Sequence, residues 1–279
     1  MIAMLIFVMS CGKKQPYSLK IMCDEKFHTI INQLEKGFHE GFGVPITLLP
    51  FDANLVQKDV FTSYDLLLTD DSALTKRLCD NGILVETIDF CYATPILVLR
   101  NNERLSIKNI ADLAVHSEKP LRLAVASEHS TLSELVRSGL EKNQVKTQGE
   151  NVHVQFVSQN EQQNSDNRAK DKNEKQIKSQ NLVFLLQQLK DNEIDMIACW
   201  DFDWSQKLKN SEFTKSSAES FWAIQFSHEP NITVPILLGI TKDCTDYAIC
   251  RAFFDFIKSN IGREIYKNNF ENNASAVSR

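Results

Sequence analysis

The chain lacks the short motifs that mark the common enzyme classes. Its 279 residues contain no G-x-S-x-G nucleophile elbow, no H-E-x-x-H zinc motif and no phosphate-binding loop. The six histidines are scattered. Two of them, His28 and His39, fall in one expected helix, but their i and i+11 spacing is too long for them to share a metal ion. We therefore expect neither a metal site nor an enzyme.

The chain also lacks a basic surplus and any C-x-x-C motif. Its 31 Lys and Arg are outnumbered by 36 Asp and Glu, which argues against a nucleic-acid partner, because binding phosphate requires clustered positive charge. None of the seven cysteines forms a C-x-x-C, so a zinc or thioredoxin-like motif has no support. Cys23 and Cys199 lie in apolar runs and are expected to be small buried hydrophobes. The oxidation state of the cysteines stays open.

The first ten residues, MIAMLIFVMS, are uncharged and almost wholly apolar, and they end directly before Cys11. A polar stretch over 12–16 follows. This pattern resembles a bacterial lipoprotein leader, in which the cysteine becomes the lipidated first residue of the mature protein. It implies a leader and tether over 1–16, lipid anchoring at Cys11 and a place in the cell envelope outside the cytoplasm. The alternative is a buried strand over 2–8 with Cys11 as a core thiol, since no basic residue precedes the apolar run.

Beyond residue 16, segments typical of strands alternate with segments typical of helices, which indicates an α/β protein with parallel sheets. No later apolar run approaches the roughly 18 residues needed to span a membrane. Thr131 and Glu134 form a capping box at the start of one expected helix. A polar stretch over 158–180 contains only two apolar residues and is expected to be a solvated insertion. Strands are expected at 19–23, 44–49, 66–68, 95–99, 121–126, 152–157, 194–199 and 235–240, and helices at 27–38, 72–78, 107–113, 131–140, 182–189 and 245–260.

Several segments, in order, resemble a known family. Residues 27–42 look like the first helix of periplasmic solute-binding proteins. The segments 64–71 (YDLLLTDD), 107–113, 193–200 (EIDMIACW) and 252–259 (AFFDFIKS) are similar to corresponding stretches of the molybdate-binding group. The resemblance covers roughly residues 18–271.

This resemblance implies a two-lobed periplasmic-binding-protein fold of type 2, in which each lobe is a mostly parallel sheet flanked by helices. It places lobe 1 at 17–92 and 235–279, and lobe 2 at 93–234 with the insertion 158–180. The implied function is that of a monomeric receptor that binds a small ligand between its lobes and delivers it to the permease of an ABC-type importer. By resemblance the ligand is an oxyanion such as molybdate or tungstate, and no resident cofactor is expected.

Candidate ligand contacts follow from the rule that ligands of open α/β sheets lie beyond the carboxyl ends of the strands, at helix N-termini. Molybdate binders carry Ser, Ala and Tyr in these turns, whereas this chain has acids, a lysine and a tryptophan. The acids either cap helices and point away, or the ligand is not a bare divalent oxyanion. Lys26 either supplies positive charge or is solvated, and Trp200 is either a stacking wall or a core aromatic. The candidate ligand-binding residues are Asp24, Glu25, Lys26, Asp52, Thr69, Asp70, Ser127, Ser130, Thr131, Trp200 and Asp201.

Three alternatives to an oxyanion receptor remain open. The ligand could be organic or cationic. The chain could be a degenerate relative that acts as a sensor or surface interaction module, which the altered turns favour. It could also be an enzyme, and then His129 beside Ser130 is the histidine of interest.

Overall fold

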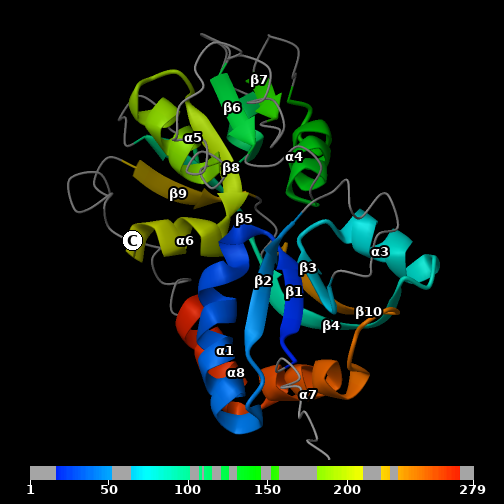
Figure 1. The fold of residues 1–279 in the computed structure, drawn as a ribbon. Helices are drawn as coiled ribbons and strands as arrows, with labels where there is room; N and C mark the ends of the chain where they lie inside the picture. The colour runs from blue at the N-terminus through cyan, green and yellow to red at the C-terminus, as the bar shows by residue number, and fades with distance from the viewer. Residues whose placement is uncertain are drawn as a thin grey trace, which may run out of the picture.

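The computed structural model places the strands in two separate five-stranded sheets, each with helices against it (Figure 1). We call these lobe 1, built on sheet A, and lobe 2, built on sheet B. Cys11, Asp52, Ser127, His129, Ser130 and the insertion 158–180 lie outside the residues that the structure describes. The described residues are 17–51, 64–100, 107–108, 110–114, 121–125, 131–145, 152–156, 181–209, 221–226 and 232–270.

Sheet A has the strand order β2-β1-β3-β10-β4. Strand β1 is parallel to both its neighbours, β2 and β3, and β10 runs antiparallel to β3 and β4. The expected strands are all present, but β4 was not predicted. Glu86 and Asp89 interrupt its apolar residues, so it has no continuous apolar run. The bounds are β1 (Leu19–Cys23), β2 (Ile46–Pro50), β3 (Leu66–Thr69), β4 (Leu84–Ala93) and β10 (Val234–Thr241).

Sheet B repeats this plan with the order β7-β6-β8-β5-β9. Strand β6 is parallel to β7 and β8, and β5 runs antiparallel to β8 and β9. Each sheet is therefore mixed, with one reversed strand among parallel ones. The edge strand β9 was also missed from sequence. The bounds are β5 (Pro95–Arg100), β6 (Leu121–Val125), β7 (Val152–Phe156), β8 (Met196–Trp200) and β9 (Phe221–Gln225).

The chain passes between the sheets twice. Strand β4 of sheet A is followed, after Thr94 alone, by β5 of sheet B. The return leads from β9 in sheet B to β10 in sheet A. Because β10 lies between β3 and β4, the C-terminal part of the chain completes the sheet that the N-terminal part begins.

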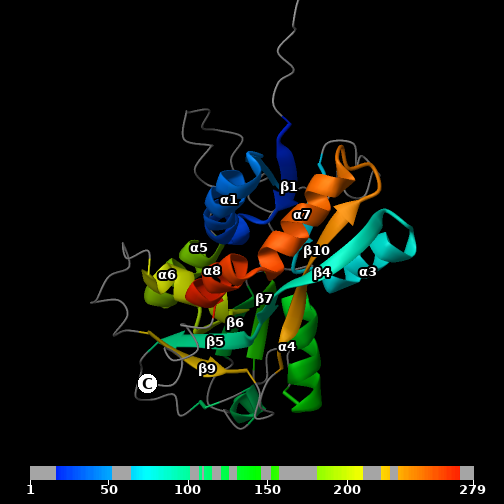
Figure 2. The same ribbon diagram turned by 90° about the horizontal axis from the view of Figure 1, so that it is seen from below.

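Helices cover both faces of sheet A because its strands bury alternate residues on opposite sides. Leu66 and Leu68 join the core that packs against α1 and α7, whereas Leu67 packs toward α3 on the other face. Figure 2 shows α1, α7 and α8 grouped together and α3 apart from them. The bounds are η1 (Glu25–Phe27), α1 (His28–Phe42), α3 (Ser72–Asp80), α7 (Tyr247–Lys258) and α8 (Asn260–Phe270).

Sheet B is covered in the same way. Leu123 and Val125 share a core with α4, and Ala124 packs with α5 on the other face. Cys23 and Cys199 are fully buried, as expected, and the cysteines at 23, 79, 91, 199, 244 and 250 are free thiols. The bounds are η3 (Ile110–Ala114), α4 (Thr131–Lys142), α5 (Asn181–Lys190) and α6 (Asp201–Lys209).

Two helix predictions require correction. The C-terminal helix ends at Lys258, and a second helix follows after Ser259, whose backbone is extended and whose hydroxyl accepts a hydrogen bond from the N–H of Gly262. A Cβ at Gly262 would lie 2.4 Å from the carbonyl oxygen of Ile257, so the tight corner requires glycine. The segment expected as a helix over 107–113 contains a 3-10 helix, η3, instead. None of the described helices is long and apolar enough to cross a membrane.

Candidate ligand site between the two lobes

The residues that follow β1, β3 and β8 meet the start of α4 where the lobes face each other. In lobe 1, β1 and β3 end at Cys23 and Thr69, and the chain then enters η1 and α3. In lobe 2, β8 ends at Trp200 and leads directly into α6, and α4 begins at Thr131 after β6. The expected meeting of strand ends is thus brought about by two adjacent parallel strands in each sheet.

Asp70 is the central residue of the contact between the lobes. Its Oδ2 accepts a hydrogen bond from Lys26 Nζ of lobe 1 at 2.6 Å, and another from Trp200 Nε1 of lobe 2 at 2.6 Å. Asp70 and Trp200 are only 7% and 1% exposed. One carboxylate oxygen therefore receives a charge-assisted bond from an ammonium and a bond from an indole across the lobe boundary.

Asp24 adds a second carboxylate, with its Oδ2 3.8 Å from Lys26 Nζ. We call Asp24, Lys26 and Asp70 the interlobe charge cluster, and its formal charge is −1. Burial raises the pKa of Asp24 to about 6, although Lys26 acts in the opposite direction and Asp70 adds to the rise. Burial alone would lower the pKa of Lys26, but the carboxylates of Asp70, Asp24 and Asp203 outweigh it and raise that pKa. Lys26 is therefore held as a cation.

A second polar contact joins the lobes two residues after Asp70. The Thr131 hydroxyl accepts a hydrogen bond from the backbone N–H of Ser72 at 2.9 Å and donates one to Ser72 Oγ at 2.8 Å. The structure begins α4 at Thr131 itself, so this residue is not the N-cap that the capping box required. The first turns of α3 and α4 are instead linked through one hydroxyl.

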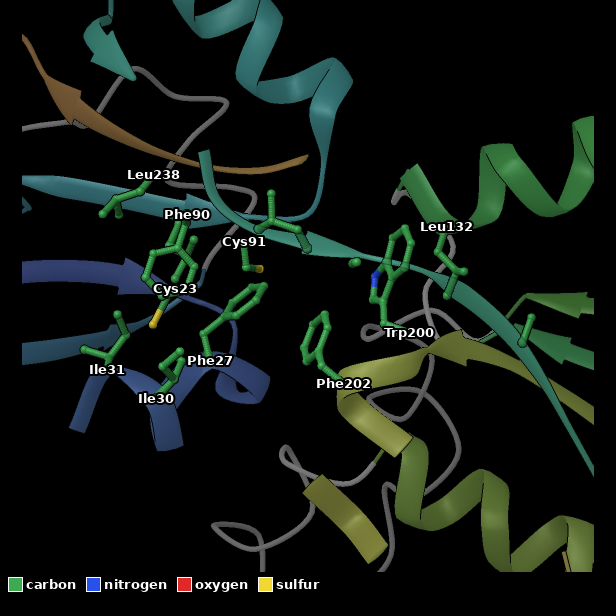
Figure 3. Packing of buried hydrophobic residues seen from close by; sticks show 14 of the residues in the cluster. Cys23, Phe27, Ile30, Ile31, Phe90, Cys91, Leu132, Trp200, Phe202 and Leu238 are labelled. Atoms are coloured by element: carbon green, nitrogen blue, oxygen red, sulfur yellow. The ribbon is translucent and has the colours of Figure 1, made fainter. Parts of the chain in front are cut away.

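Beside the charged residues, aromatic rings pack across the boundary. Phe27 of η1 stacks on Phe202 of α6 with ring centroids 5.6 Å apart, and Phe90 meets Phe27 edge-on at 6.2 Å. Phe27 and Phe202 face each other from the two lobes in Figure 3, with Cys91 close by. Both rings are almost fully buried. The contact is therefore partly a dry apolar interface and partly a polar one.

Other acids in these turns have structural roles. The Asp71 carboxylate caps α3 by accepting a hydrogen bond from the N–H of Leu74 at 2.8 Å. Asp201 Oδ1 accepts from the N–H groups of Thr94 and Phe202, at 3.1 and 2.8 Å, and so ties the β4–β5 crossing to the start of α6. Burial raises the pKa of Asp71 and of Asp201. The capping interpretation thus holds for Asp71, whereas Asp201 anchors the β4–β5 crossing, Asp24 makes no capping bond and Asp70 bonds across the lobes.

Of the candidate residues, the structure brings Asp24, Lys26, Asp70, Thr131 and Trp200 together at the lobe boundary. Thr69 is buried and its hydroxyl accepts from the N–H of Asp71, while Glu25 is exposed in η1. Asp52, Ser127 and Ser130 lie outside the described residues.

Sequence reasoning missed the roles of Ser72, Asp203 and Phe202. Ser72 opens α3, and Phe202 and Asp203 lie in the first turn of α6, so all three directly follow the strand ends and the same rule that selected their neighbours could have found them. Within the part of the chain that the structure describes, no group of three or more His, Cys, Asp or Glu residues is arranged to hold a metal ion.

Two mixed α/β sheets, joined by two crossings of the chain and facing each other at the ends of their parallel strands, are the architecture of two-lobed binding proteins. The comparisons with known proteins agree with this class. The chain belongs to the family of bacterial extracellular solute-binding proteins, whose family model matches residues 19–270. No curated protein matches the chain.

Solved structures of similar fold share little sequence with the chain. Iron-bound HitA from Pseudomonas aeruginosa aligns with a TM-score of 0.63 at 13% identity, over 91% of this chain and 84% of that protein. The ferric binding protein from Campylobacter jejuni also gives 0.63, at 16% identity over 91% and 85% of the two chains. The periplasmic molybdate-binding protein of Azotobacter vinelandii gives 0.56, at 11% identity over 91% and 98%. These likenesses confirm the two-lobed α/β fold.

Proposed function

We propose that this protein is the extracytoplasmic receptor of an ABC-type importer, which binds a small solute between its lobes and presents it to a membrane permease. Family membership supports a solute-binding role. The observation that carries the site is that Lys26 of lobe 1 and Trp200 of lobe 2 donate to the same Asp70 oxygen. Groups that converge from both lobes are those that a solute can use to hold the lobes together.

The solute itself is not determined by the fold. The similar structures named above are described as iron-bound, ferric-binding and molybdate-binding. The resemblance of the sequence makes molybdate and tungstate the first ligands to test. The charges count against a bare divalent oxyanion, because each like-charged pair at ~4 Å costs about 4 kcal/mol at an effective dielectric of ~20. Asp24 and Asp70 together carry one more negative charge than Lys26 can balance.

The proposed receptor is a monomer that is anchored to the membrane by lipid on Cys11. A tethered receptor stays near its permease, which suits a transport role. Incorporation of a radiolabelled or alkyne-tagged fatty acid into the full chain, and its loss in Cys11→Ser, would support the anchor. Equal labelling of both proteins would refute it.

We also propose that the protein binds its solute without transforming it. Native mass spectrometry and elemental analysis of freshly purified protein test the proposal directly. We expect one small solute per chain, and we expect that solute to be released unchanged on unfolding. Molybdenum or tungsten at one per chain would identify an oxyanion receptor, whereas a chemically altered solute would indicate an enzyme.

A sensor or interaction module is the second candidate, because the polar groups at the lobe boundary already bond to one another. It predicts no bound solute and no thermal shift with oxyanions, metal ions, amino acids or sugars.

A further inference from the structure

The interlobe charge cluster shows which charges a solute must carry. It contains one ammonium, on Lys26, and two carboxylates, on Asp24 and Asp70, with side chains that are 21%, 13% and 6% exposed. Buried charges are stable only when each has an opposite partner. A solute that binds at the cluster therefore has to leave the Lys26–Asp70 pair intact or provide an opposite charge for each of the two side chains.

The groups around the cluster fall into two sets. Donors for an anionic group are the Lys26 ammonium and the Trp200 indole N–H, which now converge on Asp70. Acceptors for a cationic group are the carboxylates of Asp70 and Asp24, which now surround the Lys26 ammonium. The Phe27 ring, whose centroid lies 5.5 Å from Lys26 Nζ, adds an aromatic face beside the cation position.

A solute with a single charge sign can use only one of these sets. An anion would take the donors but lie close to two carboxylates, whose net charge Lys26 does not fully balance. A simple cation would take the carboxylates but compete with the Lys26 ammonium beside them. A zwitterion can separate Lys26 from Asp70 and pair with each, and the formal charge of the site then stays at −1.

We propose that the solute is a small zwitterion of the amino-acid type, whose ammonium binds Asp70 and Asp24 and whose carboxylate binds Lys26 and the Trp200 indole. In the structure, the Lys26 ammonium and the Asp70 carboxylate bind each other and so occupy the places that the two charged groups of the solute would take. The Ser72 hydroxyl lies two residues beyond Asp70, and the Thr131 hydroxyl lies at the start of α4 in the other lobe. Both hydroxyls can donate further hydrogen bonds to the carboxylate of the solute. This inference rests on the proposed function, since it names the class of solute for that same site.

The test is isothermal titration calorimetry on the full chain, purified after unfolding and refolding to remove bound solute. The panel contains the common amino acids, sodium molybdate and sodium tungstate. For each amino acid that binds, the methyl ester (cation only) and the N-acetyl derivative (anion only) are measured as well. We expect an amino acid to bind and both single-charge derivatives to bind at least 100-fold more weakly.

Variants test whether Lys26 and Asp70 bind the amino acid. Lys26→Met and Asp70→Asn are each expected to weaken amino-acid binding at least 100-fold. Their matched controls, Lys36→Met and Asp80→Asn, change exposed residues of the same types on α1 and α3 and should leave binding unchanged. If a site variant does not fold, the derivatives measured on the unaltered protein still decide the question.

The outcomes separate this inference from the proposed function. Single-charge derivatives that bind as well as the amino acid would overturn the zwitterion. Binding of molybdate or tungstate with no response to any amino acid would overturn it too, and would leave the receptor function standing. No binding by any member of the panel, in a refolded protein with the native circular dichroism spectrum, would count against both.

Discussion

Replacing Lys26 by methionine should destabilise the protein strongly, because it removes the cation from the interlobe charge cluster and leaves Asp24 and Asp70 without it. Removing one partner of a buried ion pair typically costs about 3–5 kcal/mol. Lys26 is 21% exposed and Trp200 still donates to Asp70, so we place the loss at the lower end of that range, at about 3 kcal/mol. Asp70→Asn should cost less, about 2 kcal/mol, because Lys26 keeps Asp24 at 3.8 Å.

The double variant Lys26→Met/Asp70→Asn isolates the pair. If the two side chains interact as their 2.6 Å contact implies, the double variant loses less than the sum of the single losses, by about 1–2 kcal/mol. The assay is urea unfolding followed by circular dichroism at pH 8, with Lys36→Met as the control on the exposed side of α1. A loss below about 1 kcal/mol for Lys26→Met, or strict additivity of the two changes, would refute the reasoning.

Three further predictions concern neighbours of this pair. Burial raises the pKa of Asp24 from an ordinary 3.8 to about 6, so charging this carboxyl destabilises the fold as the pH rises from about 4 to about 6. Asp24→Asn should therefore be more stable than the unaltered protein at pH 8, by about 2–3 kcal/mol, and equal to it near pH 4; a pH-independent difference in urea unfolding would contradict this. Phe202→Ala removes the ring stacked on Phe27 and should lower the free energy of unfolding by about 3–5 kcal/mol. The control Phe184→Ala changes a residue that is 43% exposed and should cost less than about 1 kcal/mol. Equal losses of stability on thermal denaturation would count against an interlobe core. Thr131→Val removes both hydrogen bonds to Ser72, worth about 1 kcal/mol each, and should enlarge the radius of gyration in X-ray scattering; an unchanged radius would show that this contact does not hold the lobes together.

Much of the fold could be predicted because its strands and helices have clear periodicity. The buried strands β3 and β8 are mainly continuous apolar runs, and β1 is interrupted only by Lys20. Helix α1 ends directly before Gly43, whose φ of 67° is a left-handed conformation that glycine adopts easily. Strand β4 was missed because charged and apolar residues mix along it. Its pairing with β10 is a long-range contact that no local pattern reveals. The break at Ser259 was missed because the apolar periodicity of α7 was extended past its last residue, Lys258, over a serine that caps the next helix.

The sequence predicted which residues meet at the lobe boundary, but not the contacts that they make there. The strand-end rule selected Asp24, Lys26, Asp70 and Trp200 correctly as neighbours. It could not decide whether an acid caps a helix or faces the other lobe, since both outcomes place an Asp directly after a strand. Asp71 and Asp70 show the difference: adjacent in sequence, one caps α3 and the other accepts from Trp200 of lobe 2. That choice depends on the packing of the lobes against each other.

The contacts between the lobes set a condition on a solute that binds at the proposed site. Trp200 and Asp70, and Thr131 and Ser72, bond across the boundary, so a solute that lies between them must first separate these groups. Only molecules with separated lobes can bind, so the apparent affinity falls in proportion to the fraction of molecules that are open. Each kcal/mol of free energy in the contacts lowers the apparent affinity about fivefold. A solute regains this free energy only by bonding to the same groups when the lobes close around it. A molecule that satisfies both the donors to Asp70 and the acceptors around Lys26 regains the most, and this favours a solute that carries charges of both signs.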